Sequence, residues 1–186
     1  MLTETLVADK KYSVEDYFEL EKTSEIRHEF INGDIIAMLG ESKKANEIAG
    51  NIYVSLRNSF KKRALKVYNH DVRLMLENNR YRYPDIVVAP TIDDEDSHAI
   101  TQPVLIVEVF SENSVKTDTV DKLREYSTLP TLQYYLIVSQ EEPFVEIYAK
   151  NADKWEFSYF TDLQESIELT ALDASILMGD IFEGIF

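Results

Sequence analysis

The sequence contains no cysteine among its 186 residues. That absence excludes disulfides, thiolate zinc sites and cysteine nucleophiles, and it is compatible with a reducing cytosol. Glycine and proline are scarce, with five of each, which argues against long flexible linkers. No apolar stretch approaches membrane-spanning length, and the first residues lack the apolar core of a signal peptide. We therefore expect a cytoplasmic protein without a membrane segment.

Positively charged residues are also few compared with acidic ones. Lysine and arginine number 19 against 34 acidic residues, which gives a formal net charge of −15. Nucleic-acid binders usually carry a basic stripe, so this balance argues against such a partner. Basic residues nevertheless cluster at Lys43-Lys44, within 57–66, and at Arg80 with Arg82. The cluster in 57–66 could touch phosphates, or it could be a solvated face that balances nearby acids.

What remains is the composition of a folded protein. Apolar residues make up 45% of the chain and aromatic residues 11%, which excludes a disordered polypeptide. The length suits one domain with a proper core, so we expect residues 1–186 to form a single domain.

Periodicity predicts a mixture of helices and strands. Ser13 with Asp16 resembles a capping box at the start of a helix, and Asn32-Gly33 is a strong hairpin signal. The predicted elements are a helix from 14 to 21, strands near 26–31 and 34–39, an amphipathic helix after Ser42, strands at 66–77, 81–89 and 103–110, a helix at 114–128, strands at 132–139, 144–150 and 154–160, and a final helical turn.

Two of the predicted strands, 103–110 and 132–139, are apolar on both faces. Such strands belong in the middle of a sheet that is covered on both sides. The helix between them suggests a right-handed parallel crossover. The expected fold class is α/β, with a central mixed sheet, helices on both sides and additional hairpins.

Two carboxylates occupy positions where apolar residues are expected. Glu108 lies in the strand 103–110, and burying its charge costs several kcal/mol, roughly, unless it is paired or binds a metal. A structural salt bridge or an exposed strand end would also explain it. Asp85 follows Pro84 at the start of an apolar strand, where a Pro-Asp turn is the ordinary interpretation. Together, the two acids can converge at one edge of a sheet, and Mg²⁺ prefers one or two carboxylates plus water and phosphate oxygens.

Two further residues are candidates, each with an ordinary alternative. Glu29 could serve as a third acid or as a residue on a solvent-facing strand surface. Lys122 lies on the helix after the Glu108 strand and could return over the strand ends, although most lysines are solvated surface residues. The histidines at 28, 70 and 98 show no metal-ligand spacing, and we assign no site role to them.

The motifs in their order resemble those of the Uma2 family, within the PD-(D/E)xK restriction-endonuclease-like superfamily. The resemblance runs roughly from Tyr12 to Phe182. It rests on the segments Ser13-Val14-Glu15-Asp16-Tyr17, His28-Glu29-Phe30-Ile31-Asn32-Gly33-Asp34-Ile35, Tyr83-Pro84-Asp85-Ile86-Val87-Val88, Leu105-Ile106-Val107-Glu108-Val109-Phe110-Ser111 and Tyr135-Leu136-Ile137-Val138, with Asp118, Lys122 and Tyr126 between the last two.

The resemblance implies a role for each candidate. Asp85 would be the metal-binding acid of the PD element, and Glu108 would be the second metal ligand. Phe110 stands where the superfamily has its strand lysine, and the family places a lysine on the following helix, which points to Lys122. Glu29 would be the additional acid from the N-terminal region. The implied cofactor is Mg²⁺ or Mn²⁺.

The chain departs from the family pattern at three positions. Ala45, Tyr134 and Ser139 stand where relatives often carry histidine, glutamate and another acid. The family resemblance favours a metal-dependent endonuclease that cleaves nucleic acid, with DNA preferred over RNA, and fold relatives suggest a homodimer by analogy. The departures and the acidic charge favour the alternative, a catalytically weak or inactive nuclease-fold protein that acts as a binding or assembly module.

Overall fold

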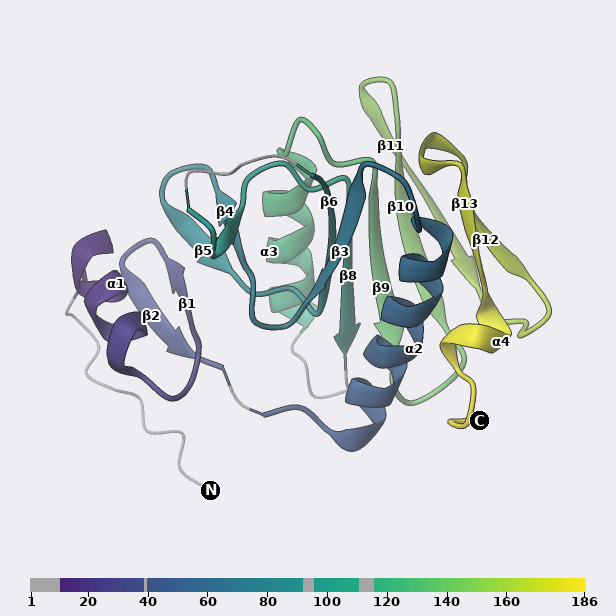
Figure 1. Cartoon of the computed structure of the whole chain (residues 1–186), viewed down its shortest axis with the longest axis horizontal. Helices are drawn as coiled ribbons and strands as arrows, with labels where there is room; N and C mark the ends of the chain where they lie inside the picture. Colours follow the sequence, from purple (N-terminus) through teal and green to yellow (C-terminus); the bar gives the residue numbers. More distant parts are fainter. Residues whose placement is uncertain (1–10, 39, 92–95, 111–115) are drawn as a thin grey trace.

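A computed structural model describes residues 11–38, 40–91, 96–110 and 116–186 (Figure 1). Its largest sheet has six strands in the order β11-β10-β9-β8-β6-β3, and its pairs are antiparallel except for parallel β8 and β9. These strands are β3 (Leu65–Asn69), β6 (Ile86–Pro90), β8 (Leu105–Phe110), β9 (Tyr134–Ser139), β10 (Val145–Asn151) and β11 (Lys154–Phe160).

A five-stranded sheet stands beside it, in the order β2-β1-β5-β4-β7. Its strands are β1 (His28–Ile31), β2 (Asp34–Ala37), β4 (Arg73–Leu76), β5 (Arg80–Arg82) and β7 (Ala99–Ile100). A two-stranded sheet, β12 (Ser166–Leu169) with β13 (Ala174–Leu177), lies near the C-terminus, with a 3-10 turn at Thr170–Leu172. The helices are α1 (Val14–Thr23), α2 (Lys43–Ser59), α3 (Lys116–Ser127) and α4 (Met178–Ile181).

Helices α2 and α3 cover opposite faces of the six-stranded sheet (Figure 1). Alternate residues of β6 and β8 point to opposite faces, as the strand period requires. Ile86 and Val107 join Ile48 and Ile52 of α2 in one buried cluster. Val87 and Ile106 join Tyr126 of α3 in the other. The expected α/β class, with a mixed central sheet and helices on both sides, is confirmed.

Most predicted elements are present. The capping box at Ser13 and Asp16 opens α1, the Asn32-Gly33 hairpin joins β1 to β2, and β8, α3 and β9 form the parallel crossover. The predicted strand 34–39 and helix 114–128 extend into residues 39 and 111–115, which lie outside the described residues, as do residues 92–95. Strands β12 and β13 are absent from the sequence-based prediction. No helix of the described ranges combines the length and the apolar character that a membrane crossing needs.

The prediction of continuous strands at 66–77 and 81–89 is wrong. The first breaks into β3 and β4 at residues 70–72, where His70 takes a left-handed backbone with φ of 45°. The second breaks into β5 and β6 around Pro84, which has no N–H to donate to a ladder. In each case the two halves belong to different sheets. Three consecutive polar residues at 69–71 and Pro84 mark the two breaks in the sequence, but neither indicates that the chain changes sheet there.

Candidate metal centre

Asp85 lies where the chain crosses from β5 into β6. Its carbonyl accepts a hydrogen bond from the His70 N–H at 3.1 Å, and its Oδ2 accepts one from the Val109 N–H at 2.6 Å. The side chain is 12% exposed. The Val109 N–H therefore fixes the carboxylate and the His70 N–H fixes the backbone of Asp85, which a solvated Pro-Asp turn would not require.

Glu108 is the cross-strand neighbour of Asp85. Ile86 pairs with Val107 in antiparallel β6 and β8, so continuing the register by one residue sets Asp85 opposite Glu108. Directly opposed side chains of such a pair have Cβ atoms about 5 Å apart. The expectation that the two acids converge at one end of the sheet is met by this register.

Helix α3 supplies the partners of Glu108. The Lys122 ammonium donates to Oε2 at 3.1 Å, and the Tyr126 hydroxyl donates to Oε1 at 2.9 Å. The two donors are four residues apart and thus on one face of the helix. The side chains of Glu108 and Lys122 are 12% and 14% exposed, so Lys122 is not a solvated surface lysine. The ordinary interpretation of Glu108, a structural salt bridge, describes this contact correctly.

Burial and like charge act together on the two acids. Burial raises the pKa of Asp85 well above its ordinary value, and the negative charges of Glu108 and Glu41 raise it further. The hydrogen bond from the Val109 N–H acts in the opposite direction and lowers this pKa. Burial also raises the pKa of Glu108, opposed by Lys122. Carboxylates held together in a buried place favour a proton or a cation between them, because either one relieves the repulsion.

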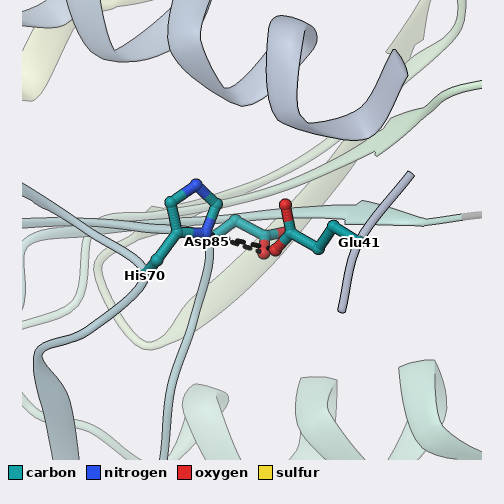
Figure 2. A group of neighbouring side chains, drawn as sticks. All are labelled: Glu41, His70 and Asp85. Atoms are coloured by element: carbon teal, nitrogen blue, oxygen red, sulfur yellow. Dashed lines mark ion pairs between the residues drawn. The ribbon is translucent and has the colours of Figure 1, made fainter. Parts of the chain in front are cut away.

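Glu41 and His70 complete a compact group with Asp85 (Figure 2). The Nδ1 atom of His70 lies 3.1 Å from Oε1 of Glu41 and 3.8 Å from Oδ1 of Asp85. One ligand atom from each of the three residues lies within 4.8 Å of the others. Two carboxylates and an imidazole are a donor set that divalent transition ions accept.

The pKa values of Glu41 and His70 depend on each other. Their hydrogen bond raises the pKa of His70 and lowers that of Glu41. The sequence motifs do not identify these two residues, since neither lies in a ligand-spacing pattern. His70 reaches Asp85 from the turn after β3, and Glu41 from the residue before Ser42, the N-cap of α2.

Solvent reaches this group through an open pocket of about 660 Å³. The pocket lies between the segment after α1, the segment that leads into α2, and the turn after β3. Its lining residues are Ser24, Glu25, Ile26, Arg27, Met38, Gly40, Glu41, Ser42, Lys43, Asn46, His70 and Asp71. The Glu41 and His70 side of the centre is thus open to a ligand larger than water.

Glu29 lies in a neighbouring ion network. Its Oε2 accepts from Nη1 of Arg82 at 2.7 Å, and Nε of Arg82 donates to Glu125 of α3 at 3.0 Å. The residue is 9% exposed, so the solvent-facing alternative is wrong. Its charge contributes to the raised pKa of Glu108, which places it near the centre, while Arg82 neutralises its carboxylate.

Comparison with known proteins gives consistent relatives. The model of the family Uma2, described as "Putative restriction endonuclease", matches residues 14–177. The uncharacterized protein slr1290 of Synechocystis sp. is 29% identical over 177 residues, which cover 94% of this chain and 93% of that protein. The uncharacterized protein sll1609 of the same organism is 34% identical over 143 residues, which cover 75% of this chain and 81% of that protein.

A solved structure shares the fold. It is a crystal structure titled as a "putative nuclease belonging to DUF820" from Anabaena variabilis, with a TM-score of 0.75 and 17% identity over 93% of this chain and 98% of that one. The architecture is therefore of the restriction-endonuclease-like class that the sequence resemblance implied. The family model matches most of the chain, residues 14–177, which shows that the chain belongs to the Uma2 family, described as "Putative restriction endonuclease".

Proposed function

We propose that this protein is a metal-dependent phosphodiester hydrolase that acts on nucleic acid, with DNA as the preferred substrate. The observation that carries the proposal is the convergence of Glu41, Asp85 and Glu108, where burial first and then the neighbouring acids raise the pKa of Asp85. An acid cluster that needs a counter-charge suits a divalent cation, and a family described as nucleases suits a phosphate substrate.

Asp85 is the proposed shared ligand of the centre. Glu108 lies on one side of it, and Glu41 with His70 lies on the other. Mg²⁺ or Mn²⁺ bound there would supply positive charge to the phosphate oxygens and to the attacking water. The donor set fits such an ion, because carboxylates suit Mg²⁺ and Mn²⁺ while the imidazole adds preference for Mn²⁺.

Lys122 has the role of a phosphate-stabilising and water-orienting group. Its ammonium is held beside Glu108 at 3.1 Å and is nearly buried, so its charge acts in a poorly screened environment. Hydrolysis adds a water oxygen to phosphorus and breaks one ester P–O bond, and negative charge grows on the phosphoryl oxygens. A fixed ammonium stabilises that charge without reorganisation. Glu29 has the role of an outer acid, held by Arg82, that adds negative charge near the centre.

Cleavage tests the proposal. The purified chain is incubated with plasmid DNA, duplex DNA, single-stranded DNA and RNA in Mg²⁺ or Mn²⁺. We expect cleavage that Asp85→Ala abolishes and that Asp153→Ala, a change of an exposed acid in the turn between β10 and β11, leaves intact. Absence of cleavage above the Asp85→Ala background with both ions and all four substrates would refute the proposal.

A second candidate function is a non-catalytic binding or assembly module. It is favoured by the internal pairing of Glu108, both of whose oxygens have partners on α3. Titration calorimetry with Mn²⁺ separates the candidates, since a decayed centre binds no ion. Tight Mn²⁺ binding that disappears in Asp85→Ala, together with cleavage, excludes the module.

A further inference from the structure

A second hollow of the surface has a charge opposite to that of the molecule. Its volume is about 530 Å³, and five of the 19 basic residues of the chain line it, with no acid among the described residues of its wall. The lining residues are Tyr53, Arg57, Phe60, Lys61, Lys62, Arg63, Leu65, Lys66, Val67, Tyr68, Asn69 and Val72, which we call the basic groove. In a chain of net charge −15, such segregation of positive charge calls for an explanation.

Two of the five cations have partners within the protein. Arg63 donates to the Leu172 carbonyl and to the Asp173 carboxylate, and Arg57 donates to the Tyr53 hydroxyl. These contacts fix the wall of the groove. For Arg63, they agree with the alternative that the basic segment balances nearby acids.

The three lysines of the basic groove differ from the arginines. Lys61, Lys62 and Lys66 are exposed, and no carboxylate of the described ranges forms an ion pair with any of them. Lys62 also has a left-handed backbone, with φ of 69°, where glycine or asparagine is the favoured residue. Within the described ranges, no ion pair therefore accounts for these three ammonium groups.

The basic groove leads to the metal centre. It follows β3, which pairs with β6 and forms an edge of the six-stranded sheet. Leu65 is at one end of β3, and Asn69, opposite Ile86, is at the other. Asn69 directly precedes His70, and Ile86 directly follows Asp85. Four residue steps along a strand span about 13 Å, which is the distance from the Leu65 end of the basic groove to the metal centre. Nucleotides of one duplex strand are about 3.4 Å apart along the helix axis, so this distance corresponds to roughly four nucleotides.

We propose that the basic groove binds the phosphate backbone of the nucleic acid that the metal centre cleaves, on one side of the cleaved diester. This inference rests on the proposed function of that centre. Three exposed lysines without a carboxylate partner in the described part of the chain suit a ligand with repeated negative charge. Ammonium groups contact phosphates without reading bases. A phosphodiester chain bound in the groove can continue into the metal centre and be cleaved there. An acidic peptide has no phosphodiester for that centre, so the position of the groove beside it would not favour a peptide.

The net negative charge of the whole protein is compatible with anion binding in the basic groove. At an ionic strength of 0.15 M charges more than about 8 Å apart are largely screened, so the groove presents its local positive charge. Binding through it is independent of base sequence and weakens steeply with salt, because each phosphate contact releases a counterion.

Binding is measured without cleavage, by fluorescence anisotropy of a labelled 20-base-pair duplex in EDTA, from 25 to 200 mM salt. The groove variant is Lys61→Gln with Lys66→Gln, and the control is Lys22→Gln with Lys154→Gln, which makes the same change in net charge at α1 and at the opposite sheet edge. We expect the groove variant to lose roughly tenfold in affinity at low salt. The slope of log K against log salt should become shallower by about 1.8, at 0.9 for each phosphate contact removed.

Each outcome decides the inference. Equal losses in the groove variant and the control would overturn it, since bulk charge would then explain the binding. Polyglutamate that competes with the duplex at equal charge would assign the groove to an acidic protein and overturn it as well. The proposed function fails separately, through absence of cleavage by the unmodified protein, while EDTA keeps the binding measurement independent of that result.

Discussion

At the scale of single residues, Asp85 is the acid of the candidate site whose charge the fold accommodates least well. Its oxygen accepts from the Val109 N–H, yet burial and the acids on either side make its charge unfavourable. A residue kept in such a place contributes more to a function than to the fold. The metal-free protein should therefore carry a measurable penalty that disappears when the charge is removed.

Asp85→Asn should stabilise the metal-free protein at neutral pH. The folded-state pKa of Asp85 lies above its ordinary value of 3.8, so its contribution to stability is fully present below about pH 3.8 and is lost as pH rises through the folded-state value. The variant should melt a few degrees above the unmodified protein at pH 7, about 2–4 °C per kcal/mol, with the difference shrinking toward pH 4. Calorimetric scans in EDTA from pH 4 to 8 measure it, and a variant that melts lower at pH 7 would contradict the expectation.

His70→Ala should weaken Mn²⁺ binding more than Mg²⁺ binding. An imidazole nitrogen suits Mn²⁺ better than Mg²⁺, which keeps oxygen ligands and water. We expect the loss of Mn²⁺ affinity to exceed about tenfold, since even the outer partners of metal ligands are worth that much. Titration calorimetry with both ions measures the ratio. His98→Ala serves as the control, because the His98 side chain is 80% exposed and belongs to another segment. Equal losses for the two ions would contradict the Mn²⁺ preference, and unchanged affinity for both would exclude His70 as a ligand.

At the scale of elements, α3 matters because it brings two donors to one strand residue. Lys122 and Tyr126 both contact Glu108, and Glu125 on the same helix joins the Arg82 network of the five-stranded sheet. The helix thereby connects the second acid of the centre to the neighbouring sheet. A substitution at Lys122 can therefore show whether its ammonium acts on the substrate phosphate or on the binding of the metal ion.

Lys122→Met should lower cleavage by about a hundredfold while Mn²⁺ binding is kept or becomes tighter. The ammonium competes with a cation for the Glu108 carboxylate, so its removal frees a ligand, while the fixed charge that stabilises the reacting phosphate is lost. Cleavage rates and titration calorimetry on the same sample measure the two effects. If Mn²⁺ binding and cleavage fell together, Lys122 would act on the fold of the centre and not on the substrate.

At the scale of the whole molecule, the centre lies where the chain passes between the two large sheets. Glu41 precedes α2 on the way from β2, His70 separates β3 from β4, and Asp85 separates β5 from β6. An ion held by all three would join three such connections. Binding to the folded state alone must then stabilise the whole protein by mass action.

Saturating Mn²⁺ should raise the melting temperature. At a concentration one hundred times the dissociation constant the gain is about 2.7 kcal/mol, or roughly 5–10 °C for a chain of this size. Differential scanning calorimetry with Mn²⁺ and with EDTA measures it, and hydrogen exchange should slow at residues 69–72 and 83–86. A rise of the same size in Asp85→Ala would show that the ion acts elsewhere.

Local pattern was sufficient for much of the fold. The capping box, the Asn32-Gly33 turn and the two apolar strands around α3 each depend on neighbours within a few residues, and each was predicted correctly. Glu108 was conspicuous for the same reason, as a charge in an apolar strand. The role proposed for Lys122 needed the family resemblance, because a single lysine on a helix has no distinguishing pattern.

The remaining features depend on tertiary structure. Pairing with distant strands decides where the chain leaves one sheet for the other, so the sequence near His70 and Pro84 did not reveal the change of sheet. Glu41 and His70 lie 29 residues apart and reach Asp85 because the two sheets meet there. The sequence by itself determined that Asp85 and Glu108 were acids in apolar surroundings. Only the packing of the two sheets decided which side chains surround them, because contact between residues far apart in the chain is a property of the folded state.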